Sequence, residues 1–350
     1  MGLTKTQETI WEKARALGSG DQAVVLTDEV CAYLIGRIAH DLELAEHFPE
    51  IPAQLAPFFA SVDLDSLRLA VESPRGLFER LVSLNADADM FFACLAALHK
   101  ARLKYETILE TQPIPTLEQV GPRGLLQYGK LTPSALAGLL FWRKWFYDID
   151  NRAGQETGYL FEPVIAHAIG GTPAPANSSP VKRATNKSKG RQVDCLRERR
   201  ACELKIRVTI AASGQGRWRE ELDFPVDCRE SGYVPVLVVL DGTSNPKLTE
   251  LSAAFEREGG EVYTGDLAWE HLESLAGDTM SRFLDKYVRA PINKLIEEEP
   301  TALPELTARL GAGTLLITVG DEALSINRRE GEPENGRDET PDDAVDKVIG

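Results

Sequence analysis

Cysteine is scarce in this chain, and so are the features of a membrane or secreted protein. The 350 residues contain five cysteines, an odd number, with no Cys-x-x-Cys pair and no paired histidine ligands. This pattern argues against both a disulfide framework and a structural zinc site. The sequence shows no signal peptide and no apolar run approaching the ~20 residues that cross a bilayer. We therefore expect a cytoplasmic protein without a membrane partner.

Positive charge is also in deficit, but only on average. The net charge is −15, which by itself argues against a nucleic-acid partner. Between residues 181 and 219, however, twelve basic residues stand against three acidic ones, a local charge of +9 that leaves −24 for the rest of the chain. Such a basic segment is typical of a surface that docks a phosphate backbone. Its basic residues are Lys182, Arg183, Lys187, Lys189, Arg191, Arg197, Arg199, Arg200, Lys205, Arg207, Arg217 and Arg219.

The spacing of apolar residues divides the chain into two folded regions and a tail. Residues 1–150 carry apolar residues at three- and four-residue spacing, which predicts an all-helical region. Thr27 and Thr132 stand where helix N-caps belong, the second followed by Pro133. Within the aromatic segment 141–146, helical spacing puts Trp142 and Phe146 on one face, which favours a core stripe over a DNA contact. Residues 331–350 hold seven acids against two bases and no apolar periodicity, which predicts a disordered acidic tail.

Residues 151–330 alternate between helical and strand patterns. A helix is expected to end at Gly170 and Gly171, and an exposed, mobile loop to follow over 172–191. The run "YVPVLVVLD" is apolar on both alternations, which is typical of a central strand covered on both faces. Helices are expected over 216–231, 245–260 and 279–298, strands over 192–208 and 261–265, and a hairpin with Gly320-Asp321 at its turn over 314–329. The order α-β-β-α-β-α-β predicts an α/β (α+β) fold, a mixed β-sheet flanked by helices, after the helical N-terminal region.

The stretch "QVDCLRERRACELKI", residues 192–206, puts two acids and a lysine into a predicted hairpin. With Asp194 opposite Glu203, Cys195 lies opposite Cys202 and the two cysteines are expected as small buried thiols. Alternate residues of a strand point to opposite faces. The predicted apolar face holds Val193, Cys195, Cys202, Leu204, Ile206 and Val208. The other face holds Gln192, Asp194, Glu203, Lys205 and Arg207.

This arrangement, Asp-x8-Glu-x-Lys on the first hairpin of a mixed sheet, resembles the PD-(D/E)XK nuclease superfamily. The segment "ELKIRVTIAASGQGRWREELDFPVDCRESGYVPVLVVLD" resembles type II restriction endonucleases of the ApaLI-like family. The resemblance is clearest from Gly158 to Asp241. One position departs from the superfamily pattern, because Val193 stands where the motif nominally has proline.

The resemblance implies a function and an active site. Asp194 and Glu203 would bind Mg²⁺, Lys205 would serve the attacking water, and Glu162 on the preceding helix would join the metal ligands. The implied enzyme hydrolyses double-stranded DNA at a short palindrome, GTGCAC by the same resemblance, and acts as a homodimer because a palindrome suits a two-fold symmetric reader. On this interpretation residues 151–330 are the catalytic domain, and residues 1–150 serve dimerisation or clasp the DNA.

The chemistry of phosphodiester hydrolysis independently requires such residues. Hydroxide must approach an anionic phosphate and an alkoxide must leave, so hard cations held by carboxylates neutralise the developing charge. A lysine two residues along the same strand points the same way and can orient the water. The same three residue types also occur on the solvated face of an ordinary sheet, where opposite charges pair across strands.

Further residues are candidates for DNA contact. The segment "SGQGRWRE", residues 213–220, lacks the lysine and the spacing of a P-loop, so no nucleotide cofactor is expected. Gln215 and Arg217 are placed to touch backbone or bases, since Arg suits guanine edges and Gln suits adenine edges. The full set of candidate DNA-binding residues is Lys182, Arg183, Lys187, Lys189, Arg191, Arg207, Gln215 and Arg217.

Two other functions fit parts of the pattern. One is a repair or junction nuclease on the same core, which would not yield sequence-specific fragments from linear DNA. The other is a DNA-binding protein without catalysis, whose hairpin acids are ordinary surface charges.

Overall fold

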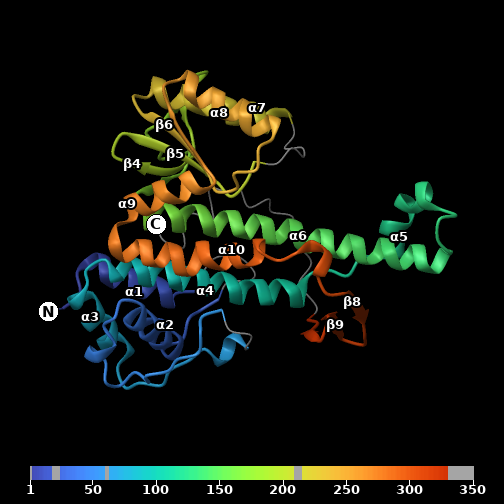
Figure 1. Cartoon of the computed structure of the whole chain (residues 1–350), viewed down its shortest axis with the longest axis horizontal. Helices are drawn as coiled ribbons and strands as arrows, with labels where there is room; N and C mark the ends of the chain where they lie inside the picture. Colours follow the sequence, from blue (N-terminus) through green and yellow to red (C-terminus); the bar gives the residue numbers. More distant parts are fainter. Residues whose placement is uncertain (1, 18–23, 60–62, 209–214, 330–350) are drawn as a thin grey trace.

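The computed structural model describes residues 2–17, 24–59, 63–208 and 215–329, and its largest sheet has five strands and lies beside the long helices (Figure 1). The strand order is β1-β4-β5-β6-β7. The strands are β1 (Thr172–Ala174), β4 (Val193–Arg197), β5 (Arg200–Lys205), β6 (Val234–Val239) and β7 (Glu261–Thr264). Pairing is antiparallel from β1 to β5 and parallel from β5 to β7, which confirms the predicted mixed sheet.

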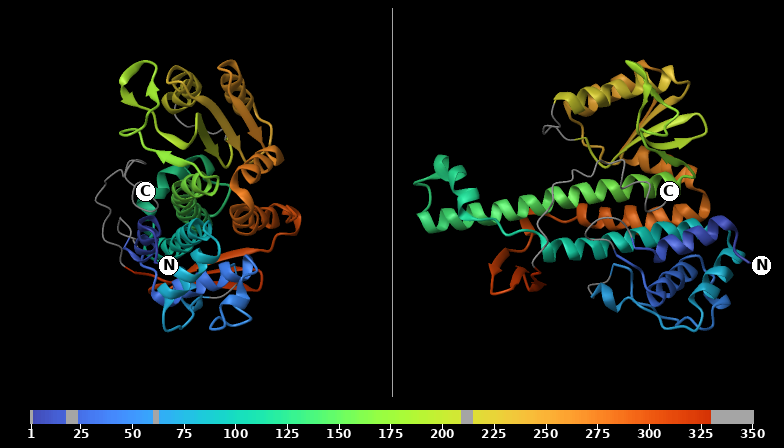
Figure 2. Two further views of the ribbon diagram at one scale, coloured as in Figure 1. Left: turned by 90° about the vertical axis from the view of Figure 1, so that its left-hand side faces the viewer. Right: turned by 180° about the vertical axis from the view of Figure 1, so that it is seen from behind.

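Helices cover both faces of this sheet. On one face, Phe224 of α7 (Gln215–Glu230) and Phe255 of α8 (Pro246–Arg257) pack with Leu237 of β6. On the other face, Ile165 of α6 (Pro133–Ala168) and Trp269 of α9 (Asp266–Leu284) join the cluster that contains alternate residues of β5 and β6. Every residue of β6 after Val234 is buried, as the two-sided apolar run predicts. Figure 2 shows the helices on either side of the strands.

The helix α6 is much longer than the sequence predicted. Two separate helices were expected on either side of residue 150, but one 36-residue helix, about 54 Å long at 1.5 Å per residue, runs through it and past Pro163. Its start is capped by the Thr132 side chain and its end by Gly170 at φ +70°, both as predicted. Figure 1 shows α6 extending beyond the sheet and carrying α5 (Leu117–Val120) near its far end.

The N-terminal region is helical, as predicted, with two helices among the described residues that the periodicity did not indicate. Besides α5 and the start of α6, its helices are α1 (Lys5–Arg15), α2 (Asp28–Asp41), α3 (Pro74–Leu84), α4 (Ala88–Thr111) and the short turns η1 (Ala45–His47), η2 (Leu64–Ser66) and η3 (Gly121–Gln127). The unexpected ones are α3 and the short α5. Trp145 is buried and Trp142 and Phe146 pack beside it, so the predicted aromatic core stripe is confirmed.

One hydrophobic cluster spans the N-terminal helices and one face of the sheet. It includes Phe91 and Phe92 of α4 together with Cys202 of β5 and Phe283 of α9. Figures 1 and 2 show α4, α6 and the α9–α10 segment running side by side under the sheet. The two regions are thus packed together through one hydrophobic core. The division of function between residues 1–150 and 151–330 stays a prediction.

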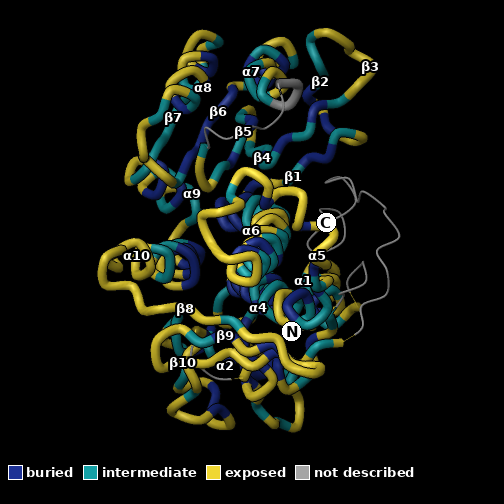
Figure 3. The backbone as a smooth tube through the Cα atoms, turned by 90° about the vertical axis from the view of Figure 1, so that its right-hand side faces the viewer, coloured by how far each residue is buried: buried dark blue, intermediate teal, exposed yellow. Residues whose placement is uncertain are grey.

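The segment 172–191 is the main correction to the fold. A mobile loop was expected, but β1 joins the central sheet and β2 (Lys182–Arg183) pairs with β3 (Asn186–Gly190) as a small hairpin. The reason is burial within the segment, where Ser179, Val181 and Arg191 are almost inaccessible and anchor the polar stretch 182–190 on both sides. Figure 3 shows β3 itself exposed, in contrast to the buried strands of the sheet.

The C-terminal elements complete the structure. After α9 come η4 (Asp285–Arg289), α10 (Ala290–Ile296) and η5 (Pro300–Ala302). A kink at Gly277, with φ of +67°, divides α9, and the helical stretch that follows it as far as Ile296 confirms the helix expected over 279–298. The helix before the kink was not predicted. A separate sheet contains β8 (Leu306–Leu310), β9 (Thr314–Val319) and β10 (Glu322–Asn327), with Gly320-Asp321 at the predicted turn. The acidic tail lies outside the described residues. In the part of the chain that the structure describes, no helix has the length and apolar character needed to cross a membrane.

Candidate active site

The β4–β5 hairpin has the predicted register. Cys195 pairs with Cys202, and both thiols are buried and free. The faces also separate as expected at this point, because Cys195 and Cys202 join the cluster with α6 and α9 while Ala201 joins the cluster with α7. Three residues depart from the predicted apolar face. Val193 packs with Ala174 and Val181 in the α7-side cluster, where the pairing of β1 with β4 is irregular. Val208 packs against the same cluster, and Ile206 is 37% exposed.

Asp194 is fixed by the neighbouring strand. Its Oδ2 accepts a hydrogen bond from the backbone N–H of Leu204 at 2.8 Å. This bond ties the carboxylate of β4 to the centre of the Glu203-Leu204-Lys205 segment of β5. The two strands therefore hold the acids and the lysine as one rigid unit.

Lys205 lies between two carboxylates. Its Nζ is 3.1 Å from Oε1 of Glu203 and 3.6 Å from Oε1 of Glu221, which comes from α7. All three side chains are only 18% exposed. The ammonium is thus held in a largely dry position by acids from two elements.

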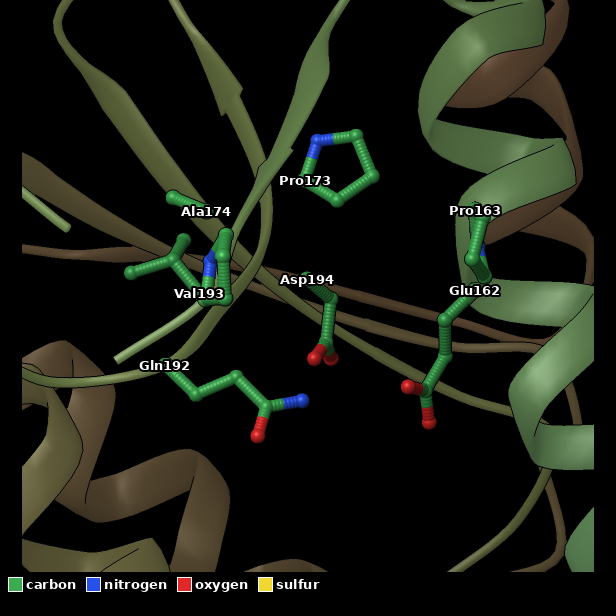
Figure 4. Close-up of a pocket in the computed structure, with 8 residues that line it drawn as sticks. Glu162, Pro163, Pro173, Ala174, Gln192, Val193 and Asp194 are labelled. Carbon is green, nitrogen blue, oxygen red and sulfur yellow. The ribbon is translucent and has the colours of Figure 1, made fainter. Parts of the chain in front are cut away.

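Glu162 approaches Asp194 from α6. Both residues line a pocket, whose other lining residues are Gln192, Val193, Ala174 and the prolines Pro163, Pro173 and Pro175. Figure 4 shows the two carboxylates and the Gln192 amide pointing into the same space. The helix continues through Pro163, so Glu162 lies within α6 and not at a helix start. The structure therefore brings together all four predicted catalytic residues.

The electrostatics of the site are dominated by negative charge. Burial raises the pKa of Asp194 well above its usual value, and the nearby carboxylates of Glu203 and Glu162 raise it further. Burial alone would lower the pKa of Lys205, but Glu203, Glu221 and Asp194 together raise it above the ordinary lysine value. The lysine is therefore held as a cation. The carboxylates around it outnumber it, so the site favours the binding of further positive charge.

The donor set fits a hard divalent cation that also binds substrate. Within the described residues no group of three or more His, Cys, Asp or Glu side chains is placed to hold a metal ion. Mg²⁺ needs less than that, because it is commonly bound through one or two carboxylates with waters and substrate phosphates as its other ligands. Asp194 and Glu203 supply two such carboxylates beside an excess of negative charge, and Glu162 lines the same pocket as Asp194.

The candidate DNA-binding residues differ in whether their side chains are already paired with acids of the protein. Arg183, Lys187 and Arg191 form ion pairs with Glu220, Glu230 and Asp227 of α7. Arg191 is only 7% exposed, so its contacts lie within the protein. Lys189 and Arg207 are exposed, and Lys182 donates to the carbonyl of Ser179. Gln215 and Arg217 belong to the first turn of α7, but their side chains lie outside the described residues.

Glu221 is the site residue that the sequence interpretation missed. Counting along α7, Glu221 shares a helical face with Phe224 and Cys228, which are both buried against the sheet. Acidic residues are rarely placed on a core-facing stripe unless they are paired. An acid at that spacing was therefore an available signal.

Comparison with known proteins identifies the class to which this chain belongs. Residues 63–289 match the model of the ApaLI-like restriction endonuclease family. The chain therefore belongs to this family, and it is a type II site-specific deoxyribonuclease that acts on double-stranded DNA. The match begins at residue 63, so the family resemblance reaches well into the helical region and beyond the segment 158–241 where it was expected to be clearest.

One curated relative is similar over most of its length. The chain is 50% identical over 264 residues to the type II restriction enzyme ApaLI of Acetobacter pasteurianus, which covers 71% of this chain and 70% of the relative. No solved structure matches the chain.

Proposed function

We propose that this restriction endonuclease is a Mg²⁺-dependent enzyme of the PD-(D/E)XK type whose active site is Asp194, Glu203 and Lys205, with Glu162 completing it. The observation that carries the proposal is the convergence at one end of the β4–β5 hairpin. There Lys205 lies 3.1 Å from Glu203, and Asp194 shares a pocket with Glu162. Restriction endonucleases generally use a divalent metal, and the oxygen donors here favour Mg²⁺ over softer metals.

Each residue has a defined task on this proposal. Asp194 and Glu203 hold the cation, which when bound would offset the charge of the phosphate and of the developing transition state. The Leu204 N–H keeps the Asp194 oxygens aimed at that position. Lys205 orients the attacking water through its ammonium, and Glu203 and Glu221 keep that ammonium in place. Because the transition state is mainly a problem of charge and position, such preorganised groups account for most of the required catalysis.

The partner and its recognition follow from the class of enzyme. A palindromic site suits a homodimer, in which each protomer cuts one strand, and GTGCAC is the first sequence to test. Residues 1–150 would serve dimerisation or clasp the DNA. Of the predicted set, Lys189 and Arg207 are exposed and form no ion pair among the described residues, so they are the best placed to meet the phosphate backbone. Lys182 is half-buried, and its ammonium donates to the carbonyl of Ser179.

Digestion of a long, fully sequenced, unmethylated DNA tests the proposal. With Mg²⁺ the wild-type enzyme should yield discrete fragments whose ends define the site, and EDTA should abolish them. Lys205→Ala should cut at least about 100-fold more slowly, the low end of what a positioned acid or base contributes. Lys205→Arg should also be inactive, because the guanidinium keeps the charge but not the compact geometry. Lys294→Ala, on the exposed surface of α10, is the control and should cut normally.

The alternatives give different results in the same assay. A repair or junction nuclease would cut without producing discrete fragments from linear DNA. A DNA-binding protein without catalysis would shift DNA in a gel while leaving it intact. Full activity of Asp194→Asn or Lys205→Ala would remove those residues from the active site.

A further inference from the structure

The long helix α6 has an exposed polar stripe that continues the active site along its length. At 100° per residue, Asn151 and Gln155 lie within about 40° of each other and of Glu162 around the helix axis. Both amides are exposed, whereas Ile149 is buried and Glu156 pairs with Lys104 of α4 on the opposite side of α6. The two amides therefore face the same side as Glu162, away from the helical core.

Neither amide has a structural task that the described residues reveal. The side chains of Asn151 and Gln155 make no hydrogen bond or other polar contact within the described part of the chain. Asparagine is a poor choice for a helix interior, because its side chain competes for backbone hydrogen bonds. An exposed Asn in the middle of the longest helix is therefore better explained by something outside the chain than by helix stability.

The backbone beside these amides is also left open. Gly154 and Gly158 flank Gln155 in the helix interior, where glycine weakens a helix. A Cβ added at Gly154 would meet no atom within 4 Å, and one at Gly158 would meet only Oε1 of Glu162, at 4.0 Å. The packing of the protein itself does not require either glycine. Their absence of side chains instead lets a large partner approach the helix closely at the two amides.

The spacing along the helix matches the spacing of DNA bases. With a rise of 1.5 Å per residue, Gln155 lies about 10 Å and Asn151 about 16 Å from Glu162 along the axis of α6. Base pairs follow one another every 3.4 Å, so these distances correspond to about three and about five base pairs. A duplex that runs along α6 with its cleaved phosphate at Asp194 and Glu162 would therefore bring bases of a six-base-pair site to both amides. Figure 1 shows that the sheet and its covering helices overlie one end of α6, and that the helix continues beyond them.

We propose that Gln155 and Asn151 are specificity-determining residues that hydrogen-bond base edges within the recognition site, and that the amide that meets an A·T pair reads its adenine. An amide side chain offers one donor and one acceptor, which pair with N7 and the N6 amino group of adenine. The proposal deepens the proposed function, since it uses the active site at Asp194 and Glu162 to set the distance. Glu162 marks the position of the reacting phosphate, which a cation held by the carboxylates would bind, and the amides read the bases farther along the helix.

Cleavage of modified duplexes tests this directly. Each adenine of the recognised site is replaced in turn by 7-deazaadenine, which lacks the N7 acceptor, and cleavage rates are measured for the wild type, Gln155→Ala and Asn151→Ala. The wild type should lose about 5- to 100-fold at the adenine that is read. The variant of the reading residue should show a similar loss on unmodified DNA and no further loss when that adenine is modified.

Two additional variants separate recognition from folding. Gln155→Glu keeps the size and helix propensity of the side chain but removes the donor, so it should behave like Gln155→Ala. Thr157→Ala is the matched control, since Thr157 is exposed on the far side of α6 and its hydroxyl bonds the carbonyl of Ala153. It should cut like the wild type. Thermal unfolding should place all the variants close to the wild type.

Other outcomes would overturn the inference. If an alanine variant on a modified duplex shows a loss of cleavage rate equal to the product of the two separate losses, the residue does not read that adenine. Normal rates and normal discrimination for both alanine variants would show that neither amide reads DNA. Failure of the underlying active site is a separate result, because it would appear as normal cutting by Asp194→Asn whatever the amide variants do.

Discussion

At the scale of single residues, the geometry around Lys205 explains how a lysine is kept charged and aimed in a partly buried site. An isolated buried ammonium would lose its proton, because burial disfavours the charged form. Here Glu203 from its own strand and Glu221 from α7 oppose that effect and raise the pKa of Lys205. Glu221 touches neither DNA nor metal in this account, so it is a positioning residue that acts through the lysine.

Replacing Glu221 by Gln should reduce the rate of DNA cleavage without weakening DNA binding. The amide keeps the shape of the side chain but loses the charge that holds the ammonium, so kcat should fall about tenfold with little change in KM. Single-turnover cleavage and gel-shift titration measure the two effects separately. Glu250→Gln, which removes an acid from the surface of α8, should change neither. A variant that binds DNA less tightly but cuts at the normal rate would contradict the positioning role.

At the scale of elements, the β2–β3 hairpin is attached to α7 by charge. Arg191 lies 3.6 Å from Asp227, its guanidinium stacks 5.6 Å from the Phe224 ring, and both charged side chains are almost inaccessible. Asp227 also accepts a hydrogen bond from the backbone N–H of Ala184, between the two strands. One buried ion pair thus connects both ends of the hairpin to the helix that carries Glu221.

Arg191→Met should therefore destabilise the protein, whereas Lys189→Met should affect only DNA binding. Removing the arginine leaves the Asp227 carboxylate buried without its cation, a change that typically costs about 3 kcal/mol or more. Urea denaturation should show this loss of stability for Arg191→Met and almost none for Lys189→Met, which is exposed. The salt dependence of DNA affinity should weaken only for Lys189→Met. Equal stability of the two variants would mean that Arg191 is not the structural anchor.

The sequence could predict the elements that have strong local patterns. Strand alternation predicted the pairing of Cys195 with Cys202, and the two-sided apolar run predicted the central position of β6. The site residues followed from the same register, because a period of two decides which side chains share a face. These parts of the fold depend on neighbours in the sequence or on one adjacent strand.

The parts that sequence could not predict depend on distant contacts. The continuity of α6 through Pro163 is imposed by packing against α4, α9 and β4, which overrides the local tendency of proline to begin a helix. The charge count for residues 181–219 stopped inside α7, one residue before Glu220, and the acids Glu220, Asp227 and Glu230 of that helix neutralise three of the basic residues. Nothing in the local pattern indicates that the polar segment 172–191 would find those acids.

At the scale of the whole molecule, the two regions share one core, so a change in either should affect the stability of both. A buried histidine, His99, lies in α4, and a half-buried one, His167, lies in α6. Burial, with a smaller contribution from Arg102, lowers the pKa of His99 in α4 to about 4. Burial, assisted by Lys13, also lowers the pKa of His167 in α6 to about 4. Both ring nitrogens of His99 lack a hydrogen-bond partner among the described residues.

These histidines should make the protein lose stability as the pH falls from about 6.5 to about 4. In the unfolded chain they take up protons near pH 6.5, but the folded state resists protonation until about pH 4. The unfolded state therefore binds more protons over this range, and the free energy of unfolding must decrease as the pH is lowered. For His99 alone the difference approaches about 3 kcal/mol at the acid end.

The variant His99→Leu isolates this contribution from that of the carboxylates, which also titrate at the acid end. Leucine fills a similar volume without nitrogen atoms that need partners, so stability at pH 7.5 should be equal to or above that of the wild type. Urea denaturation at intervals between pH 7.5 and pH 4.5 should then show a shallower decline for the variant, while His47→Gln, at the surface, should follow the wild type. Parallel curves for His99→Leu and the wild type would mean that His99 is not what resists protonation. A shallower curve would establish that α4, far from the active site in sequence, sets part of the acid limit of the folded enzyme through the core that it shares with the catalytic sheet.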